Sequence, residues 1–296
     1  MSPRARRTTA VALLGAFGTL TARGVLEATP PGGPARWMRA NHRGDRVSLL
    51  EGPAVGVGLL LGGVLGAVDA RAAGAVACAT TGAAVFGVVD DLAEGTGSTA
   101  KGLGGHLGAL ARGQLTTGGL KVLGIGATSV LAAALATARP VAGRRVGWVV
   151  DVATSGALIA ATANLVNLFD LRPGRALKAV ALGAAPIVLH GRGGARVASA
   201  VVGVAAGAVR ADLRERDMLG DGGANALGAA LGLAAVQDAP RATRLALLAG
   251  VVAATLASER VSFTEVIGRT PVLREIDEWG RRQRGPQDIS PAGAQG

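Results

Sequence analysis

The sequence predicts an all-α fold, a polytopic bundle of about nine transmembrane helices. Apolar residues make up 49% of the 296 residues and charged residues only 17%, and the mean hydropathy is +0.40. Soluble domains carry about 25% charged residues, so this chain has too few charges to cover a globule of its size. The 47 glycines are small residues of the kind that lets membrane helices approach closely.

The third observation is the length of the apolar stretches, since a helix needs roughly 17–25 mostly apolar residues to cross ~30 Å of hydrocarbon. Nine stretches are candidates, and the sixth, seventh and eighth are short, so we expect eight to ten spans. They lie near residues 8–26, 53–69, 72–89, 118–138, 146–169, 176–190, 196–210, 222–237 and 243–258. We expect residues 1–258 to form one membrane domain and residues 259–296 a cytoplasmic tail, with disorder beyond Gly285.

The first stretch also has the basic start and short apolar run of a signal peptide. Residues 1–24 show no convincing small-x-small cleavage site, and Arg23 closes the run, so we favour a first span. The net charge of +11 raises the question of nucleic acid. The arginines are scattered between apolar segments without interleaved aromatic residues, which favours anionic lipid or an anionic substrate instead.

Alternation of nine spans gathers the polar segments at one end of the bundle, which we call the polar end. It comprises residues 27–52, 90–117, 170–175 and 211–221 and the tail. The larger share of Lys and Arg residues lies there, which places this end in the cytoplasm, although the arginines of residues 4–7 oppose that orientation. All acidic residues except Asp69, Asp151 and Asp238 lie there too. We interpret this clustering as a working face on the cytoplasmic side of the plasma membrane.

Two carboxylates, Asp90 and Asp91, end the third apolar stretch. An ionisable residue at a span end is a functional candidate by default. Neighbours on a helix point about 100° apart, so one carboxylate could bind Mg²⁺ while the other acts as a base. Mg²⁺ usually takes one or two carboxylates together with phosphate oxygens and water. A solvated helix end is an equal alternative for this pair alone.

Two further acidic segments end other stretches at the polar end. Asn164, Asn167 and Asp170 close the fifth, where amides and a carboxylate in an apolar helix need partners. Gly220 and Gly222 flank Asp221, where glycine permits close approach to a ligand and a helix N-terminus favours anions. Interhelical hydrogen bonding explains the asparagines equally well, and an ordinary turn explains the glycines.

Cations accompany these carboxylates. Arg172, Arg175 and Lys178 form a basic turn that could bind phosphate or retain the loop at the cytoplasmic face. Arg43 and Lys101 lie in the two longest polar loops, each of which would also pass for an ordinary cytoplasmic loop. Three acidic segments nevertheless share one face, and each has glycine or asparagine around its aspartate. Independent solvated helix ends would not all show this combination.

The order of these motifs resembles the polyprenyl-phosphate N-acetylhexosamine-1-phosphate transferase family, which includes phospho-N-acetylmuramoyl-pentapeptide transferase. The resemblance runs from about Asn41 to Asn225. It implies a multi-helix membrane enzyme of cell-wall and cell-envelope biogenesis. Such an enzyme moves a sugar-1-phosphate from a UDP-sugar to a polyprenyl phosphate, releases UMP and requires Mg²⁺.

The resemblance also implies roles for individual residues. Asp90 would activate the lipid phosphate with Asp91 as its essential neighbour, and Asp221 would be the principal Mg²⁺ ligand. We assign catalysis to Asp90, Asp91 and Asp170, and the metal to Asp221 and Asp91. The residues assigned to substrate binding are Asn164, Asn167, Lys101, Arg172, Arg175 and Arg43. The expected partners are polyprenyl phosphate, a UDP-sugar and the membrane, with no nucleic acid, and the sequence leaves a homodimer open.

The chain departs from the family pattern at three places. After Asp170 the family continues with Gly-x-Asp-Gly, whereas this chain has Leu171-Arg172-Pro173-Gly174. After Asp221 the usual Thr-Gly-Ser is Gly222-Gly223-Ala224. The late histidine motif is missing, because no histidine follows Asp221. The main alternative is therefore a catalytically silent relative that binds lipid phosphate or a protein partner. A transporter is less favoured, because the coupling sites of transporters usually lie at mid-membrane, whereas these carboxylates lie at span ends.

The tail alternates cations with apolar residues. Ser262-x-x-Glu265 reads as a capping box, and Thr270-Pro271 as a second helix start. We expect two short amphipathic helices, lying either on lipid phosphates or across the polar end of the bundle.

Overall fold

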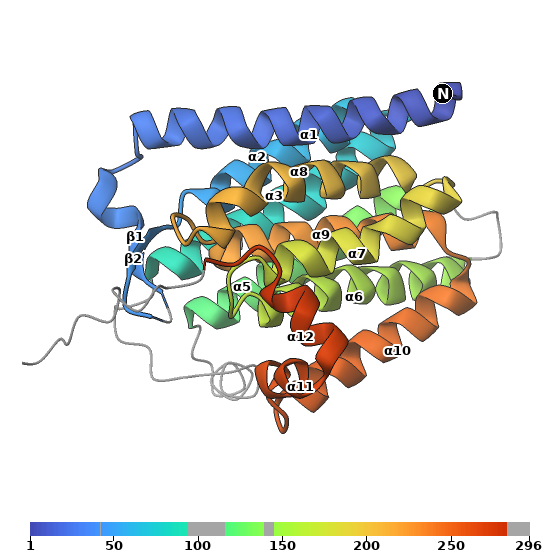
Figure 1. Cartoon of the computed structure of the whole chain (residues 1–296). Coiled ribbons are helices and arrows are strands. Elements are labelled where there is room, and N and C mark those ends of the chain that lie inside the picture. The colour runs from blue at the N-terminus through green and yellow to red at the C-terminus, as the bar shows by residue number, and fades with distance from the viewer. Residues whose placement is uncertain (42, 94–115, 139–144, 283–296) are drawn as a thin grey trace, which may run out of the picture.

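The computed structural model describes residues 1–41, 43–93, 116–138 and 145–282. Figure 1 shows long helices that run side by side and alternate in direction between two ends. Their bounds are α1 Pro3–Ala28, α2 Glu51–Leu65, α3 Ala70–Ala93, α5 Thr117–Ala136, α6 Arg145–Phe169, α7 Arg175–His190, α8 Ala195–Leu213, α9 Gly220–Asp238 and α10 Arg241–Ser258. Each of the apolar stretches predicted from the sequence overlaps one of these helices, although 53–69 runs four residues and 118–138 two residues past the helix end, and the all-α fold class is confirmed.

Five of these helices are long and apolar enough to cross a membrane by length and composition: α1, α3, α5, α6 and α10. Helix α2 is apolar but shorter, and α7, α8 and α9 do not reach the same criteria among the residues described. These five helices therefore indicate a membrane protein, and the count of about nine spans stays a prediction.

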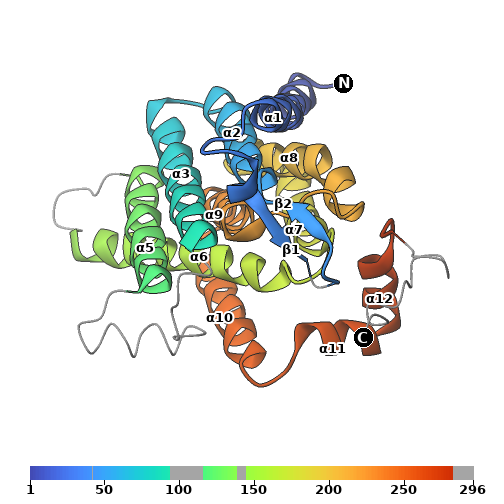
Figure 2. The ribbon, with the colours of Figure 1, turned by 90° about the vertical axis from the view of Figure 1, so that its left-hand side faces the viewer.

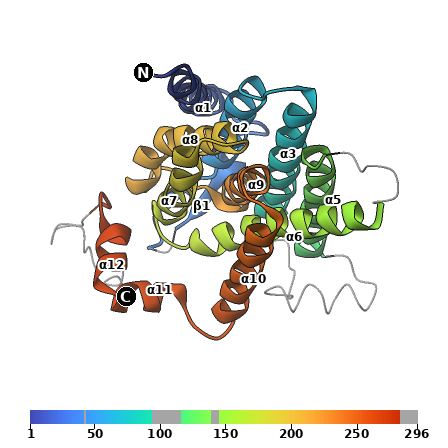
Figure 3. The ribbon, with the colours of Figure 1, turned by 90° about the vertical axis from the view of Figure 1, so that its right-hand side faces the viewer.

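Helix α9 forms the centre of the bundle. Figures 2 and 3 view the molecule from its two ends, and in both α9 is surrounded by other helices. It packs against α2, α3, α6, α7 and α8, and most of its residues are buried. Its sequence is rich in Ala and Gly because bulkier side chains would hold the surrounding helices away.

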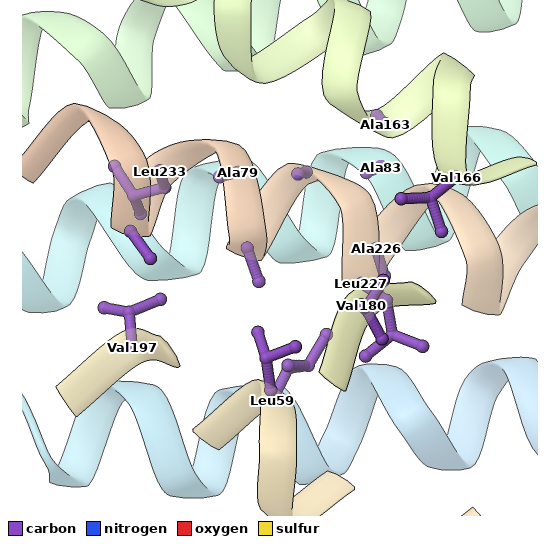
Figure 4. Packing of buried hydrophobic residues seen from close by; sticks show 14 of the residues in the cluster. Leu59, Ala79, Ala83, Ala163, Val166, Val180, Val197, Ala226, Leu227 and Leu233 are labelled. Atoms are coloured by element: carbon purple, nitrogen blue, oxygen red, sulfur yellow. The ribbon is translucent and has the colours of Figure 1, made fainter. Parts of the chain in front are cut away.

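The packing around α9 brings distant segments into one core. Figure 4 shows Leu227 and Leu233 of α9 in a cluster with Ala79 and Ala83 of α3 and Ala163 of α6. All five are buried to within 1% of complete. The packing of α9 against α3 and α6 sets the relative positions of the acidic residues at the polar ends of these helices.

A short hairpin covers the polar end, where the sequence indicated only a loop. A 3-10 turn, η1 (Pro34–Trp37), leads into strands β1 (Met38–Ala40) and β2 (Arg46–Ser48), which pair antiparallel. Ser48 continues the pairing with the α8–α9 connection, because its N–H donates to Arg216 O (3.1 Å) and its carbonyl accepts from Met218 N (2.9 Å). The hairpin therefore ties the start of α2 to the start of α9.

Arg23, near the end of α1, fixes the same connection from the other side. Its Nε and Nη2 donate to the two carboxylate oxygens of Asp217 at 2.9 and 2.6 Å. Such paired, charge-assisted bonds fix geometry as well as adding energy. The chain before Asp221 is thus held from α1 and from the hairpin.

Candidate functional site

The candidate site begins where α3 ends and α5 and α9 start. Lys121, in the second turn of α5, places its Nζ 2.6 Å from Asp90 Oδ2. The same ammonium donates to Asp221 Oδ2. One cation is therefore shared by carboxylates from two other helices, all three side chains being mostly buried. Asp90 and Asp221, predicted from separate motifs, meet at one point.

Asp91 serves the start of α9. Its Oδ1 accepts from Asp221 N (2.9 Å) and its Oδ2 from Gly222 N (3.0 Å). The residue before α9, Leu219, offers no side-chain cap, and free N–H groups at a helix start need partners. Asp91 supplies them from α3, with its negative charge at the positive end of the helix dipole. The sequence suggested a metal ligand here, whereas the geometry gives Asp91 a capping role.

The glycines around Asp221 permit this contact between α3 and α9. A Cβ at Gly87 would lie 2.4 Å from Asp221 O, and one at Gly222 would lie 2.5 Å from a methyl of Val88. Gly220 has φ +59° and lies against the Asp91 carboxylate. The sequence interpretation was close approach to a ligand, but the close approach in the structure is between neighbouring helices.

The last turn of α6 and the residue after it add two of the predicted residues, Asn167 and Asp170. Asn167 stabilises the charge of the Asp221 carboxylate, and the backbone of Gly220 does the same for Asp170. Burial raises the pKa of Asp170 well above its usual range, and the carboxylates of Asp212 and Asp221 raise it further. The segments containing Asp90, Asp170 and Asp221 are therefore brought together, as their shared face predicted.

An apolar cavity of about 250 Å³ opens beside this cluster. Lys121, Asn164 and Asn225 supply its polar wall, and the remainder is mostly aliphatic: Val122, Ile125, Ala160, Ala161, Val252 and Leu256, with Thr255. It lies among α5, α6, α9 and α10. A molecule with an anionic head beside Lys121 and an apolar chain along these walls would match its chemistry.

A second cavity, of about 220 Å³, lies under the hairpin. Asp170, Arg172 and Asp212 line it together with Glu215 and Asp217. Arg43, in the hairpin turn, forms an ion pair with Glu215 at 3.0 Å. Arg172 and Arg43 thus lie around this acidic cavity rather than beside Lys121, and their predicted contact with substrate stays a prediction.

Arg175 binds the tail. The tail forms α11 (Phe263–Arg269) and α12 (Pro271–Glu278), which begin where the sequence predicted, although Ser262 makes no side-chain cap. Arg175 donates to both oxygens of Asp277, at 2.8 and 3.0 Å. Lys178 donates to the carbonyls of Ile276, Asp277 and Trp279 at the end of α12. Of the two tail positions considered from the sequence, the structure has the one against the bundle.

Replacing Asp277 is expected to release α12. In Asp277→Asn the buried guanidinium of Arg175 loses its counter-charge, and breaking a buried pair costs about 3 kcal/mol or more. Hydrogen exchange in α12 should rise at least tenfold, whereas the exposed neighbour change Glu275→Gln should leave it unchanged. Equal protection in the two variants would contradict the docking role.

Acid should release the wild-type tail in the same way. Burial raises the pKa of Asp277, but the hydrogen bond from Arg175 and the charge of Arg281 outweigh burial and hold it below its usual range. A lowered folded-state pKa means that the docking stability is present above the unfolded value of about 4 and is lost as the pH falls below it. Exchange in α12 of the wild type should therefore rise below about pH 4, and exchange in Asp277→Asn should not.

Lys121 is a functional candidate that was not predicted from the sequence. The signal available was its place one turn inside an apolar helix, where an unpaired ammonium is costly. Lys101 lies outside the described residues. Within the described part of the chain, no three His, Cys, Asp or Glu side chains converge as a metal-binding group.

No protein-family model matches the chain, and no curated protein matches it.

Proposed function

We propose that the protein transfers a sugar-1-phosphate from a UDP-sugar to polyprenyl phosphate, with release of UMP. The observation that carries this proposal is the double role of Lys121, which binds Asp90 and Asp221 and also lines an apolar cavity. A polyprenyl phosphate has the matching polarity, since its phosphate lies at the membrane surface and its chain lies in hydrocarbon. The motif order that resembles the transferase family supports the same substrates.

Charge placement supports phosphoryl transfer. Such reactions need mainly positioning and neutralisation of the phosphate oxygens. Lys121 would neutralise the phosphates that approach Asp90 and Asp221, and Asn164, on the cavity wall, offers an amide donor. An oxygen of the lipid phosphate bonds to the β-phosphorus of the UDP-sugar. The bond from that phosphorus to the oxygen shared with UMP breaks, and UMP leaves with that oxygen.

Mg²⁺ fits part of this arrangement. Asp90 Oδ2 and Asp221 Oδ2 converge on one cation, the Lys121 ammonium, and two carboxylates with phosphate oxygens and water are a common Mg²⁺ shell. Asp90 and Asp221 would hold the ion, which would supply charge neutralisation at the diphosphate. Asp91 is left out of this set, because its two oxygens bind the start of α9.

The direct test is a transfer assay on the purified full chain with radiolabelled UDP-sugars, polyprenyl phosphate and Mg²⁺. We expect a labelled lipid product and an equal amount of UMP. Asp221→Asn should abolish turnover while the protein remains folded in detergent, and the exposed change Glu259→Gln should not. Near-normal turnover by Asp221→Asn would exclude its role.

A binding protein without catalysis is the second candidate. One observation favours it: Lys121 stands between the two carboxylates that would hold the metal. The absence of the family's further carboxylate after Asp170 agrees with it. Such a protein would bind polyprenyl phosphate through Lys121 but release no UMP.

A further inference from the structure

A third cavity lies at the other end of the bundle, far from the hairpin. It measures about 340 Å³, and its walls come from the α2–α3 turn, the ends of α5 and α9 and the start of α8. Figure 3 views this end of the molecule. Val76 and Val197 are among its apolar walls, and Arg71 and Arg196 bring two guanidinium groups into it.

Backbone carbonyl groups at the end of α5 hold the Arg71 side chain. Its Nε and Nη2 donate to the carbonyls of Leu135 (3.2 Å), Ala134 (3.1 Å) and Thr137 (2.9 Å) at the end of α5. These carbonyls form the negative end of a helix dipole, which offsets part of the cationic charge. Capping of α5 is therefore a sufficient structural reason for Arg71.

The Arg196 side chain makes fewer hydrogen bonds than that of Arg71. Its Nη1 donates to Gly66 O, at the end of α2, at 3.0 Å, and this is its one side-chain hydrogen bond within the described residues. Neither Arg196 nor Arg71 forms an ion pair with a carboxylate in that part of the chain. Asp69 also lines the cavity, but its Oδ1 caps α3 by accepting from Ala72 N at 2.8 Å.

The start of a helix also lies at this cavity. Helix α8 begins at its wall, and the residue before it, Gly194, provides no side-chain cap. The first N–H groups of a helix without a cap favour an anion. The cavity thus has two arginines and a single carboxylate, Asp69, on its wall.

We propose that this cavity binds a phosphate group, held chiefly by Arg196 with Arg71 beside it. A phosphate would take the remaining donors of Arg196 and supply the counter-charge that the described residues lack. The group could belong to free phosphate or to the headgroup of an anionic lipid. This site is separate from the candidate transferase site and does not depend on its activity.

The test uses radiolabelled inorganic phosphate in equilibrium dialysis with the full chain in a maltoside detergent. Arg196→Gln retains a donor for Gly66 O but removes the charge, and losing a charge-assisted hydrogen bond should weaken binding about tenfold or more. Arg192→Gln is the matched control, because Arg192 is exposed in the turn before α8 and does not line the cavity. It should bind phosphate like the wild type.

Lipid competition separates the two sources. Displacement of the label by phosphatidylglycerol but not by phosphatidylcholine would identify a lipid headgroup. Displacement by neither lipid would identify free phosphate, and both results support the site. If Arg196→Gln does not fold, Ala72→Asp places a carboxylate on the cavity wall in the first turn of α3 and should abolish binding. Equal binding by wild type and the folded cavity variant, or no binding by wild type, would overturn the proposal.

Discussion

Gly87→Ala is expected to slow turnover at the candidate site strongly and to destabilise the protein. The added Cβ would lie 2.4 Å from Asp221 O, 2.6 Å from Asp221 C and 2.7 Å from Gly222 Cα. All three are backbone atoms, so α3 and α9 would have to separate. Overpacking of this kind costs about 1–3 kcal/mol, and a displacement of about 1 Å in a catalytic group can cost 100-fold in rate.

A matched control for this change lies in α5. Gly126 in α5 has no atom within 4 Å of an added Cβ, so Gly126→Ala should leave the site intact and stabilise the helix by about 0.5–1 kcal/mol. Thermal unfolding in detergent and the transfer assay would be measured for both variants. A Gly87→Ala protein with wild-type unfolding and turnover would contradict the α3–α9 contact described above.

Lys121→Met is expected to have the second large effect. It leaves the carboxylates of Asp90 and Asp221 without the cation they share. Removing one partner of a buried charge cluster costs about 3–5 kcal/mol, and partial exposure here favours the lower figure. Turnover should fall at least 100-fold, while Lys121→Arg, which keeps the charge, should retain more of it.

The same variant tests the metal assignment. With the ammonium gone, Mg²⁺ should raise the unfolding temperature of Lys121→Met more than that of the wild type, because the two carboxylates gain a replacement counter-ion. Arg210→Met, an exposed change in α8, controls for the loss of a positive charge. If Lys121→Met has the same unfolding temperature and turnover as Arg210→Met, the cluster of Asp90, Lys121 and Asp221 contributes neither to stability nor to activity.

The helices and the gathering of the acidic segments could be predicted from the sequence. Apolar stretches of span length set the helices, and alternation of their directions placed Asp90, Asp170 and Asp221 at one end. The partners of individual side chains could not be predicted in this way. Asp91 caps α9 and Arg175 holds Asp277, and both depend on how helices distant in sequence pack.

The hairpin carried a local signal that was overlooked. Asn41 accepts through its side-chain oxygen from Arg43 N and Asp45 N, both at 2.9 Å, and Gly44 has φ +82°. Asn and Gly in such spacing are typical of a tight turn. The pairing of its second strand with the α8–α9 connection, in contrast, required the tertiary fold.

The most direct test of the proposed function is UMP release by wild type and by Asp90→Asn across a panel of UDP-N-acetylhexosamines, with polyprenyl phosphate and Mg²⁺. Asp90 would help hold the metal at the reacting diphosphate and would not itself bind the lipid, so Asp90→Asn should lower kcat by at least 100-fold and leave polyprenyl phosphate binding nearly unchanged. The predicted result is that the wild type releases more UMP than Asp90→Asn with at least one UDP-sugar. Equal background release by both proteins with every sugar would contradict the transferase function and leave the lipid-phosphate-binding protein in its place.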